Sequence, residues 1–221
     1  MSKLPISGRR QWTSLFLSAS GALVLTYVGY QYSSMYLAQH RLEREWQRRQ
    51  NQPAIHAQAR AVVAADSLMR LSAPRIGLDS IVVEGVGVDD LFRGPGHMEH
   101  TAFPGQIGNM VITGHRDTFF RRVSVLAPGD LLIVEQNGQR YTYQVTGKKV
   151  VAPTDLSVIQ PSSDAELTLI TCHPTLYLGP APERLVVFSR LVHQTDTKEL
   201  HAVDDRHDAP KAALKNAAGR H

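Results

Sequence analysis

The chain has 221 residues, 43% of them hydrophobic and 20% charged, a balance that permits a packed core and excludes a wholly disordered protein. Its length corresponds to one domain, or to one domain with extensions. A single cysteine excludes an intrachain disulfide and any zinc site that needs two thiolates, while a net charge of +4 without a basic stripe argues against a nucleic-acid binder.

The first apolar segment predicts a transmembrane anchor. Residues 11–40 contain no Asp, Glu, Lys or Arg. Within them, a helix over residues 12–30 would be about 28 Å long, close to the thickness of the hydrocarbon core of a bilayer. Trp12, Tyr27 and Tyr30 lie near its two ends, where amphipathic rings prefer the membrane interface.

A short basic tail precedes this segment and indicates its orientation. Lys3, Arg9 and Arg10 stand there without an acidic residue. We therefore expect residues 1–11 in the cytoplasm and the rest of the chain outside the cell membrane. A cleaved signal peptide and a buried core helix are the alternatives, because the segment lies at the amino end and its Ser, Thr and Gly residues make it only moderately apolar.

The remaining chain divides into three parts by composition. Residues 31–70 predict a helical stalk, broken near Pro53, that acts as a solvated spacer between membrane and domain. Residues 71–193 contain short β segments between Gly- and Pro-rich turns, which favours a closed barrel or a sandwich. Residues 194–221 hold ten charged residues and no aromatic one, so we expect a disordered or frayed tail.

Strands are expected in the central part wherever apolar residues alternate or run together. Asn137-Gly138 between two such segments predicts a hairpin turn. The expected strands cover residues 81–84, 109–113, 131–135, 139–145, 148–151, 166–171 and 184–191.

The single cysteine is the first candidate for chemistry. Cys172 follows an apolar strand and precedes His173-Pro174, and the missing N–H of Pro174 predicts that the strand ends at Cys172. A residue at a strand end is held rigidly and can still reach solvent, as a nucleophile requires. A lone thiol outside the cytoplasm is also typical of a reactive group, although a buried structural thiol is the alternative.

Two further residues occupy comparable positions. His115 follows the strand at residues 109–113 and comes directly after Gly114, which we expect to turn the chain sharply through torsions open only to glycine. Arg184 begins the last strand, and a hairpin-like return of the connecting loop would bring it beside Cys172. A surface role is the alternative for each of them.

Together the three side chains form a set for acyl transfer. A thiol is mostly protonated near neutral pH, and an adjacent imidazole can take its proton. A guanidinium keeps its charge and can stabilise the oxyanion that forms when a thiolate attacks a carbonyl. Cys172, His115 and Arg184 would thus act as nucleophile, acid/base and oxyanion stabiliser.

The motif blocks that carry these residues resemble those of the sortase family, and most of all class D sortases. The blocks are ITGHRD at residues 112–117, LTLITC at 167–172 and GPAPERLVV at 179–187, preceded by matching stretches between residues 94 and 109. The resemblance implies an all-β fold, an eight-stranded sortase-type β-barrel with short helices, here preceded by a transmembrane helix and a helical stalk. It assigns the catalytic roles to Cys172, His115 and Arg184.

The resemblance also implies a reaction. A sortase cleaves a Leu-Pro-x-Thr-Gly-like sorting motif of a surface protein through a thioacyl-enzyme and transfers the acyl group to an amine, such as a cell-wall peptide or a pilin lysine. It uses no cofactor. The resemblance assigns Thr171 to substrate or oxyanion contact. By loop position, residues 151–163 and Leu176, Tyr177 and Leu178 are expected to line the groove. His173 stands where class D sortases commonly have an aromatic residue, which leaves the subclass open.

Other functions compatible with these residues belong to different classes. A cysteine hydrolase, of this fold or another, would pass the acyl group to water. A non-catalytic membrane-anchored binding protein could share the fold. A zinc site could use His97, His100 and His115 with Cys172 or His173, and a cation site could use nearby acidic residues, which are Glu84, Asp89, Asp90 and Glu99.

Overall fold

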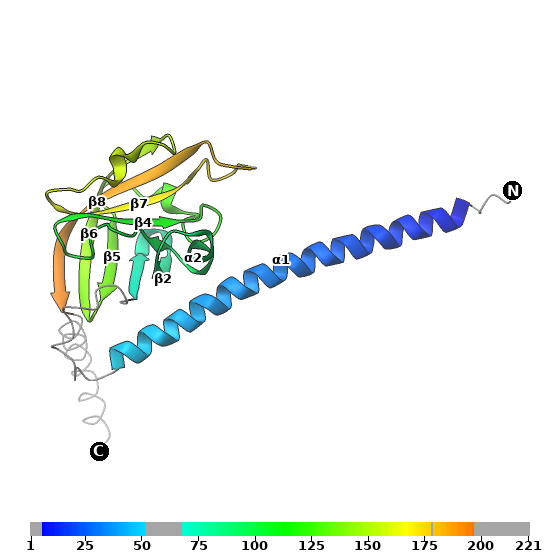
Figure 1. Ribbon diagram of the computed structural model, residues 1–221, viewed down its shortest axis with the longest axis horizontal. Helices are drawn as coiled ribbons and strands as arrows, with labels where there is room; N and C mark the ends of the chain where they lie inside the picture. Colours follow the sequence, from blue (N-terminus) through cyan, green and yellow to red (C-terminus); the bar gives the residue numbers. More distant parts are fainter. Residues whose placement is uncertain (1–5, 52–67, 178, 197–221) are drawn as a thin grey trace, which may run out of the picture.

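The computed structural model describes residues 6–51, 68–177 and 179–196. One long helix, α1 (Ile6–Asn51), is followed by a closed barrel of eight strands. Figure 1 shows the carboxyl-terminal part of α1 beside α2 and β2, while its amino-terminal part extends away from the barrel. The all-β barrel with short helices, expected from the sequence, is confirmed.

The strands close the barrel in the order β1-β2-β3-β4-β7-β8-β6-β5. Parallel pairing joins β4 to β7 and β2 to β3, and the other neighbours are antiparallel. The strands are β1 (Met69–Ala73), β2 (Leu78–Glu84), β3 (Gly96–His97), β4 (Gly108–Gly114), β5 (Leu131–Gln136), β6 (Gln139–Val151), β7 (Ala165–His173) and β8 (Glu183–Asp196). The short helices are η2 (Pro74–Ile76), α2 (Val88–Arg93), η3 (Val123–Val125) and η4 (Leu156–Ile159).

Two apolar clusters cover the two faces of the sheet. Alternate residues of β4, β7 and β8 point into the barrel, where they join an inner cluster that includes Met110, Ile112, Leu167, Leu169 and Val187. The residues between them point outward and form the outer cluster, which consists of Val111, Val151, Val158, Ile170 and Val186. The stretch before β7 that contains Val158 covers this outer face.

Most of the expected strands are present, with three differences. The segments at residues 139–145 and 148–151 form one strand, β6, whose pairing with β8 shifts register twice, so the chain bends without leaving the sheet. β1 and β3 were not predicted: β1 falls partly within the expected stalk, and β3 has only two residues, too few to show alternation. The hairpin at Asn137-Gly138 is confirmed, since both residues have positive φ between β5 and β6.

Several boundaries differ from those expected. β2 begins at Leu78, three residues before the predicted start. The chain is already in β1 at Met69 and Arg70, where the sequence predicted the end of the stalk helix. β7 includes His173, one residue beyond the predicted end. β8 continues to Asp196, because residues 194–196 of the expected tail pair with β6. The predicted break at Pro53 and residues 197–221 lie outside the described residues.

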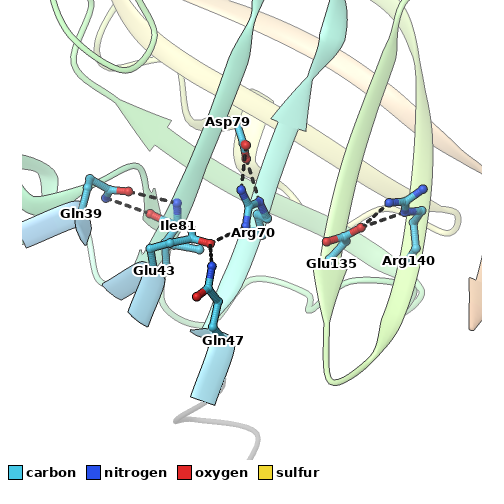
Figure 2. Close-up of polar contacts among 8 residues, drawn as sticks. All are labelled: Gln39, Glu43, Gln47, Arg70, Asp79, Ile81, Glu135 and Arg140. Atoms are coloured by element: carbon cyan, nitrogen blue, oxygen red, sulfur yellow. Dashed lines mark hydrogen bonds and ion pairs between the residues drawn. The ribbon is translucent and has the colours of Figure 1, made fainter. Parts of the chain in front are cut away.

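In the first part of the expected solvated spacer, residues 31–48 belong to α1 and pack on the barrel. Gln39 pairs with the backbone of β2 in both directions: its Oε1 accepts from the Ile81 N–H and its Nε2 donates to the Ile81 carbonyl, each at 3.2 Å (Figure 2). The same Nε2 donates to the carbonyl of Arg93 at 2.6 Å. The helix therefore satisfies backbone groups of β2 and α2 that would otherwise face solvent.

Arg70 of β1 links α1 to the neighbouring strand β2. Its guanidinium binds both carboxylate oxygens of Asp79 at 2.7–2.8 Å, and its Nη1 donates to Glu43 of α1 at 2.8 Å (Figure 2). Hydrogen bonding to Asp79, opposed by burial and assisted by Glu43, raises the pKa of Arg70. Such a forked arginine fixes direction as well as distance, so α1 has a defined orientation on the barrel.

The amino-terminal part of α1 has no such contacts. Every residue from Trp12 to Tyr30 is exposed, so the alternative of a buried core helix is wrong. By length and composition, α1 is the one helix in the described part of the chain able to cross a membrane, and none of its most apolar window, with mean hydropathy 1.3, is buried.

Candidate active site

Three neighbouring strands end at one edge of the barrel and bring the candidate residues together. Gly114, the last residue of β4, is level with Thr171 of β7, so His115 follows directly beside Cys172. On the other side of β7, Cys172 is paired with Arg184 of β8. The order β4-β7-β8 places Cys172 between the other two residues.

Cys172 and Arg184 also share one face of the sheet. Each lies two residues from a member of the outer cluster on its own strand. Because side chains alternate along a strand, both project outward at the end of the outer cluster, and His115 directly follows the neighbouring strand β4. Strand register thus brings His115 and Arg184, which are 57 and 12 positions from Cys172 in the chain, to the same edge of the barrel.

The side chains are partly exposed and separate. Cys172, a free thiol, is half-buried, as are His115 and Arg184. No hydrogen bond joins these three described side chains to one another. The Nη1 atom of Arg184 instead donates to the carbonyls of Ala181 and Glu183, at 3.2 and 3.0 Å. The loop before β8 thereby holds the guanidinium at the edge where Cys172 lies.

Gly114 is required for packing and not for an unusual torsion. It does not adopt a positive φ, so the expected sharp turn through glycine-only torsions is wrong. A Cβ atom here would lie 2.7 Å from the ring of Phe120, which is fully buried. The Phe120 N–H in turn donates to the His115 carbonyl at 3.0 Å. The absence of a side chain at residue 114 thus allows the following loop to fold tightly around His115.

Thr171 and His173, the neighbours of Cys172, project from the opposite side of β7. Thr171 is buried and its hydroxyl donates to the Gly114 carbonyl at 2.8 Å, which ties the ends of β4 and β7 together. The structure therefore places this hydroxyl within the barrel and not toward the face of Cys172. His173 ends β7 with a buried Nδ1 that has no partner among the described residues. It does not share the face of Cys172.

Arg116 has a role that the sequence did not predict. Its guanidinium donates three hydrogen bonds to the loop between β7 and β8, to the carbonyls of Pro174, Tyr177 and Gly179, at 3.2, 2.9 and 3.0 Å. The residue after His115 therefore holds the loop that joins the strand of Cys172 to the strand of Arg184. Only its place in the ITGHRD block distinguished Arg116 from a surface arginine.

The stretch at residues 151–163, which the sequence predicted to line the groove, covers the outer face of the sheet. Val151 and Val158 from this stretch are buried in the outer cluster. Buried Asn109 fixes this stretch by donating to the carbonyls of Val158 and Gln160 at 3.1 and 3.2 Å. Its Oδ1 accepts from Thr168, so a chain of buried hydrogen bonds ties this stretch to both strands.

Local capping orders the same stretch. Asp155 caps η4, and hydrogen bonds from Ser157, more than the neighbouring Lys149, lower the pKa of this carboxyl. In the β7–β8 loop, Leu176 is 92% exposed and Tyr177 48% exposed, so both offer apolar surface next to the site. Leu178 lies outside the described residues.

The alternative cation sites have no support in the described ranges. No group of three or more His, Cys, Asp or Glu side chains in those ranges could hold a metal ion. His97 is buried, with Nδ1 2.8 Å from a carboxylate oxygen of Glu84 and Nε2 3.0 Å from the Ala102 carbonyl. Asp90 pairs with Arg93 at 2.8 Å. These side chains have structural partners.

Comparison with known sequences gives one family. The model of the Sortase domain matches residues 71–192. The chain is 37% identical to Sortase D of Bacillus subtilis over 123 residues, which are 55% of this chain and 62% of that protein. It is 29% identical to Sortase A of Bacillus anthracis over 107 residues, 47% of this chain and 50% of that protein. The matches thus cover less than two thirds of these curated relatives.

Solved structures show the same fold. A Clostridium perfringens Sortase D5 transpeptidase superposes with a TM-score of 0.62 at 23% identity and covers 71% of this chain and 99% of that one; this likeness concerns the fold alone. Sortase E from Streptomyces avermitilis superposes with a TM-score of 0.54 at 31% identity, covering 60% of this chain and 92% of that one.

Proposed function

This chain belongs to the sortase family, and from that premise we propose that it is a membrane-anchored transpeptidase with Cys172 as its nucleophile. Its donor substrates are surface proteins with a Leu-Pro-x-Thr-Gly-like sorting motif, and its acceptor is an amine, such as one on a cell-wall peptide or a pilin lysine. The observation that carries the proposal is the strand register, which pairs Cys172 with Arg184 and sets Thr171 level with Gly114, the residue before His115.

The proposed reaction has two halves. The Cys172 thiolate attacks the scissile carbonyl, Arg184 stabilises the resulting oxyanion, and the His115 imidazolium protonates the departing amine, which leaves a thioacyl-enzyme. An incoming amine then attacks the thioester carbonyl and gives a proton to the now neutral His115. The C–S bond breaks, an amide forms, and the thiolate–imidazolium pair is restored. Water in place of the amine would release a carboxylate.

Arg184 can take this role without leaving its loop partners. Its guanidinium has several donors, and the carbonyls of Ala181 and Glu183 engage only Nη1. The remaining N–H groups can therefore turn toward an oxyanion at Cys172 while the loop contact is kept. Catalytic hydrogen bonds commonly tighten only when substrate binds, which fits the separate side chains of the free protein.

The donor peptide has a suitable surface beside the nucleophile. The outer cluster itself is buried, and the partly buried Ile159 and Phe188 that pack against it offer apolar contacts to the Leu and Pro of a sorting motif. Exposed Leu176 and Tyr177 add apolar surface on the β7–β8 loop, which Arg116 holds in place. The assignment of Leu178 to the same groove remains a prediction from sequence.

Membrane anchoring completes the proposal. Residues 12–30 of α1 cross the bilayer, residues 1–11 are cytoplasmic, and the barrel lies outside. Because α1 packs on the barrel from about Gln31 onward, the barrel lies close to the membrane end of the span. Enzyme and anchored substrate on one bilayer gain effective concentration, so weak recognition of a short peptide suffices.

The test is to trap the covalent intermediate. Full-length protein in detergent is incubated with a library of Leu-Pro-x-Thr-Gly peptides, and mass spectrometry is expected to find a thioacyl adduct on Cys172 but none on Cys172→Ala. Arg184→Lys should slow adduct formation by about 100-fold, since an ammonium cannot replace the planar fork. Arg190→Lys, on the same strand and exposed, is the matched control. Cleavage by Cys172→Ala, or normal rates for Arg184→Lys, would refute the assignment.

A further inference from the structure

An open cavity of about 260 Å³ lies beside His115. Its lining residues come from three elements that are distant in sequence: Gln31, Tyr32 and Met35 of α1, Leu91 and Phe92 of α2, and His115, Asp117 and Thr118 of the loop after β4. Among the described lining residues, none belongs to β7 or β8, the strands that carry Cys172 and Arg184.

The order of the strands separates this cavity from the side of the barrel where the donor peptide is proposed to bind. β4 has β7 as one neighbour and β3 as the other, and β3 in turn pairs with β2, which α1 contacts. His115, directly after β4, therefore borders both the Cys172 edge and the cavity. A group held in the cavity lies beside the imidazole.

The α1 wall of the cavity is held in a defined position. Gln39 and Glu43 lie one and two turns beyond Met35, and both are anchored to the barrel, Gln39 by the backbone of Ile81 and Glu43 by Arg70 (Figure 2). A helix that is fixed at one position is also fixed one or two turns away, because its backbone is fully hydrogen-bonded. The cavity therefore forms between the barrel and α1 in its docked position.

We propose that this cavity receives the acyl acceptor, a primary amine on an aliphatic stem, and that α1 forms one wall of the acceptor site. The proposal rests on the transpeptidase function proposed above. In such a reaction one acid/base residue protonates the leaving amine and deprotonates the entering one, so the entering nitrogen must reach both the His115 imidazole and the thioester carbonyl on Cys172. The cavity that His115 lines would hold the stem of the acceptor while its nitrogen reaches this position.

The lining chemistry fits this ligand. Met35, Leu91 and Phe92 offer apolar contacts to an alkyl stem. Asp117 is exposed and makes no ion pair among the described residues, so its carboxylate can attract the ammonium form of the acceptor. The Thr118 hydroxyl oxygen is buried and has no hydrogen-bond partner in the described ranges, which leaves it able to bind an N–H group.

The proton balance is complete without another reactant. The ammonium bound near Asp117 loses one proton to solvent. The neutral amine attacks the thioester, a C–N bond forms and the C–S bond breaks. The second proton passes from nitrogen to His115, which had become neutral when it protonated the first leaving amine.

The test measures how the thioacyl-enzyme partitions between amine and water. Full-length protein in detergent cleaves a sorting-motif peptide in the presence of either 1,5-diaminopentane, which is cationic at pH 7, or hydroxylamine, which is neutral. The amide-to-acid product ratio is compared among wild type, Asp117→Asn, Met35→Trp and the control Leu37→Trp. Leu37 is 51% exposed on α1 and lines no part of the cavity.

Met35→Trp should fill the cavity and lower the ratio about tenfold for both amines. Asp117→Asn should lower it about threefold to fivefold for 1,5-diaminopentane alone, the size expected of an exposed charge interaction. Leu37→Trp should match wild type. Ratios for Met35→Trp and Asp117→Asn equal to the control would overturn the acceptor site while leaving the transpeptidase intact. Wild type that cleaves no peptide would instead overturn the proposed function itself.

Discussion

Arg116 and Tyr177 are 61 residues apart in the sequence and meet through two different contacts. The guanidinium donates to the Tyr177 carbonyl at 2.9 Å, and its central carbon lies 5.8 Å from the centre of the tyrosine ring. Arg116, next to the proposed acid/base His115, thus holds the loop that follows the proposed nucleophile Cys172. Movements of that loop and of His115 are therefore coupled through one side chain.

Replacing Arg116 should impair catalysis through this loop. In Arg116→Lys, one ammonium cannot serve three carbonyls in the fork geometry of a guanidinium, so the loop that positions Arg184 loosens. We expect kcat/KM for peptide cleavage to fall about tenfold, with KM raised more than kcat is lowered, since Arg116 is a positioning residue. Steady-state kinetics measures both. Arg122→Lys, exposed in the segment between β4 and η3 that also contains Arg116, should behave as wild type; equal kinetics for the two variants would contradict the role of Arg116.

Gly114→Ala should destabilise the protein by about 1–3 kcal/mol. The added Cβ would lie 2.7 Å from the buried Phe120 ring, and overpacking in a filled core forces neighbours to shift. Gly147→Ala is the control, because a Cβ there meets nothing within 4 Å. Denaturant unfolding monitored by fluorescence gives both values. The double variant Gly114→Ala/Phe120→Leu should regain part of the lost stability, and a failure to do so would mean that the ring is not the obstacle.

Arg70→Met should weaken the docking of α1 and cost about 1–3 kcal/mol of stability. The substitution leaves the carboxylates of Asp79 and Glu43 without their shared partner. Arg75→Met removes an arginine whose nearest carboxylate, on Asp130, is 4.0 Å away, and it should change stability by less than about 0.5 kcal/mol. Limited proteolysis within α1 would report the docking directly. Equal cleavage rates in the two variants would show that Arg70 does not hold the helix.

Tyr143 should make the barrel sensitive to alkali. Burial raises the pKa of Tyr143 to about 12, whereas an unfolded tyrosine ionises near pH 10. Between these values the unfolded state binds fewer protons than the folded state, so stability falls as pH rises. The expected loss is about 2–3 kcal/mol between pH 10 and pH 12. Tyr143→Phe removes this contribution, so its stability should decline less over the same range; parallel curves would exclude Tyr143 as the source.

Several features of the fold were accessible from sequence because they depend on local patterns. Alternating apolar residues located β4, β5, β7 and β8 to within a few residues, and Asn137-Gly138 located a hairpin. The tight relation between Cys172 and Arg184 followed from the loop that joins their strands. The two-residue β3 was missed because so short a strand has no period to detect.

The sequence by itself determined the membrane-length apolar helix, the order of the motif blocks and the residue types at positions 115, 172 and 184, since these depend on composition and spacing along the chain. Only the tertiary structure decided that residues 31–48 pack on the barrel, that Arg116 holds the β7–β8 loop and that Gly114 makes room for Phe120. Each of these depends on groups brought together by sheet closure or helix docking. The local sequence pattern around a polar side chain on a helix is the same whether that side chain binds water or a strand 42 residues away.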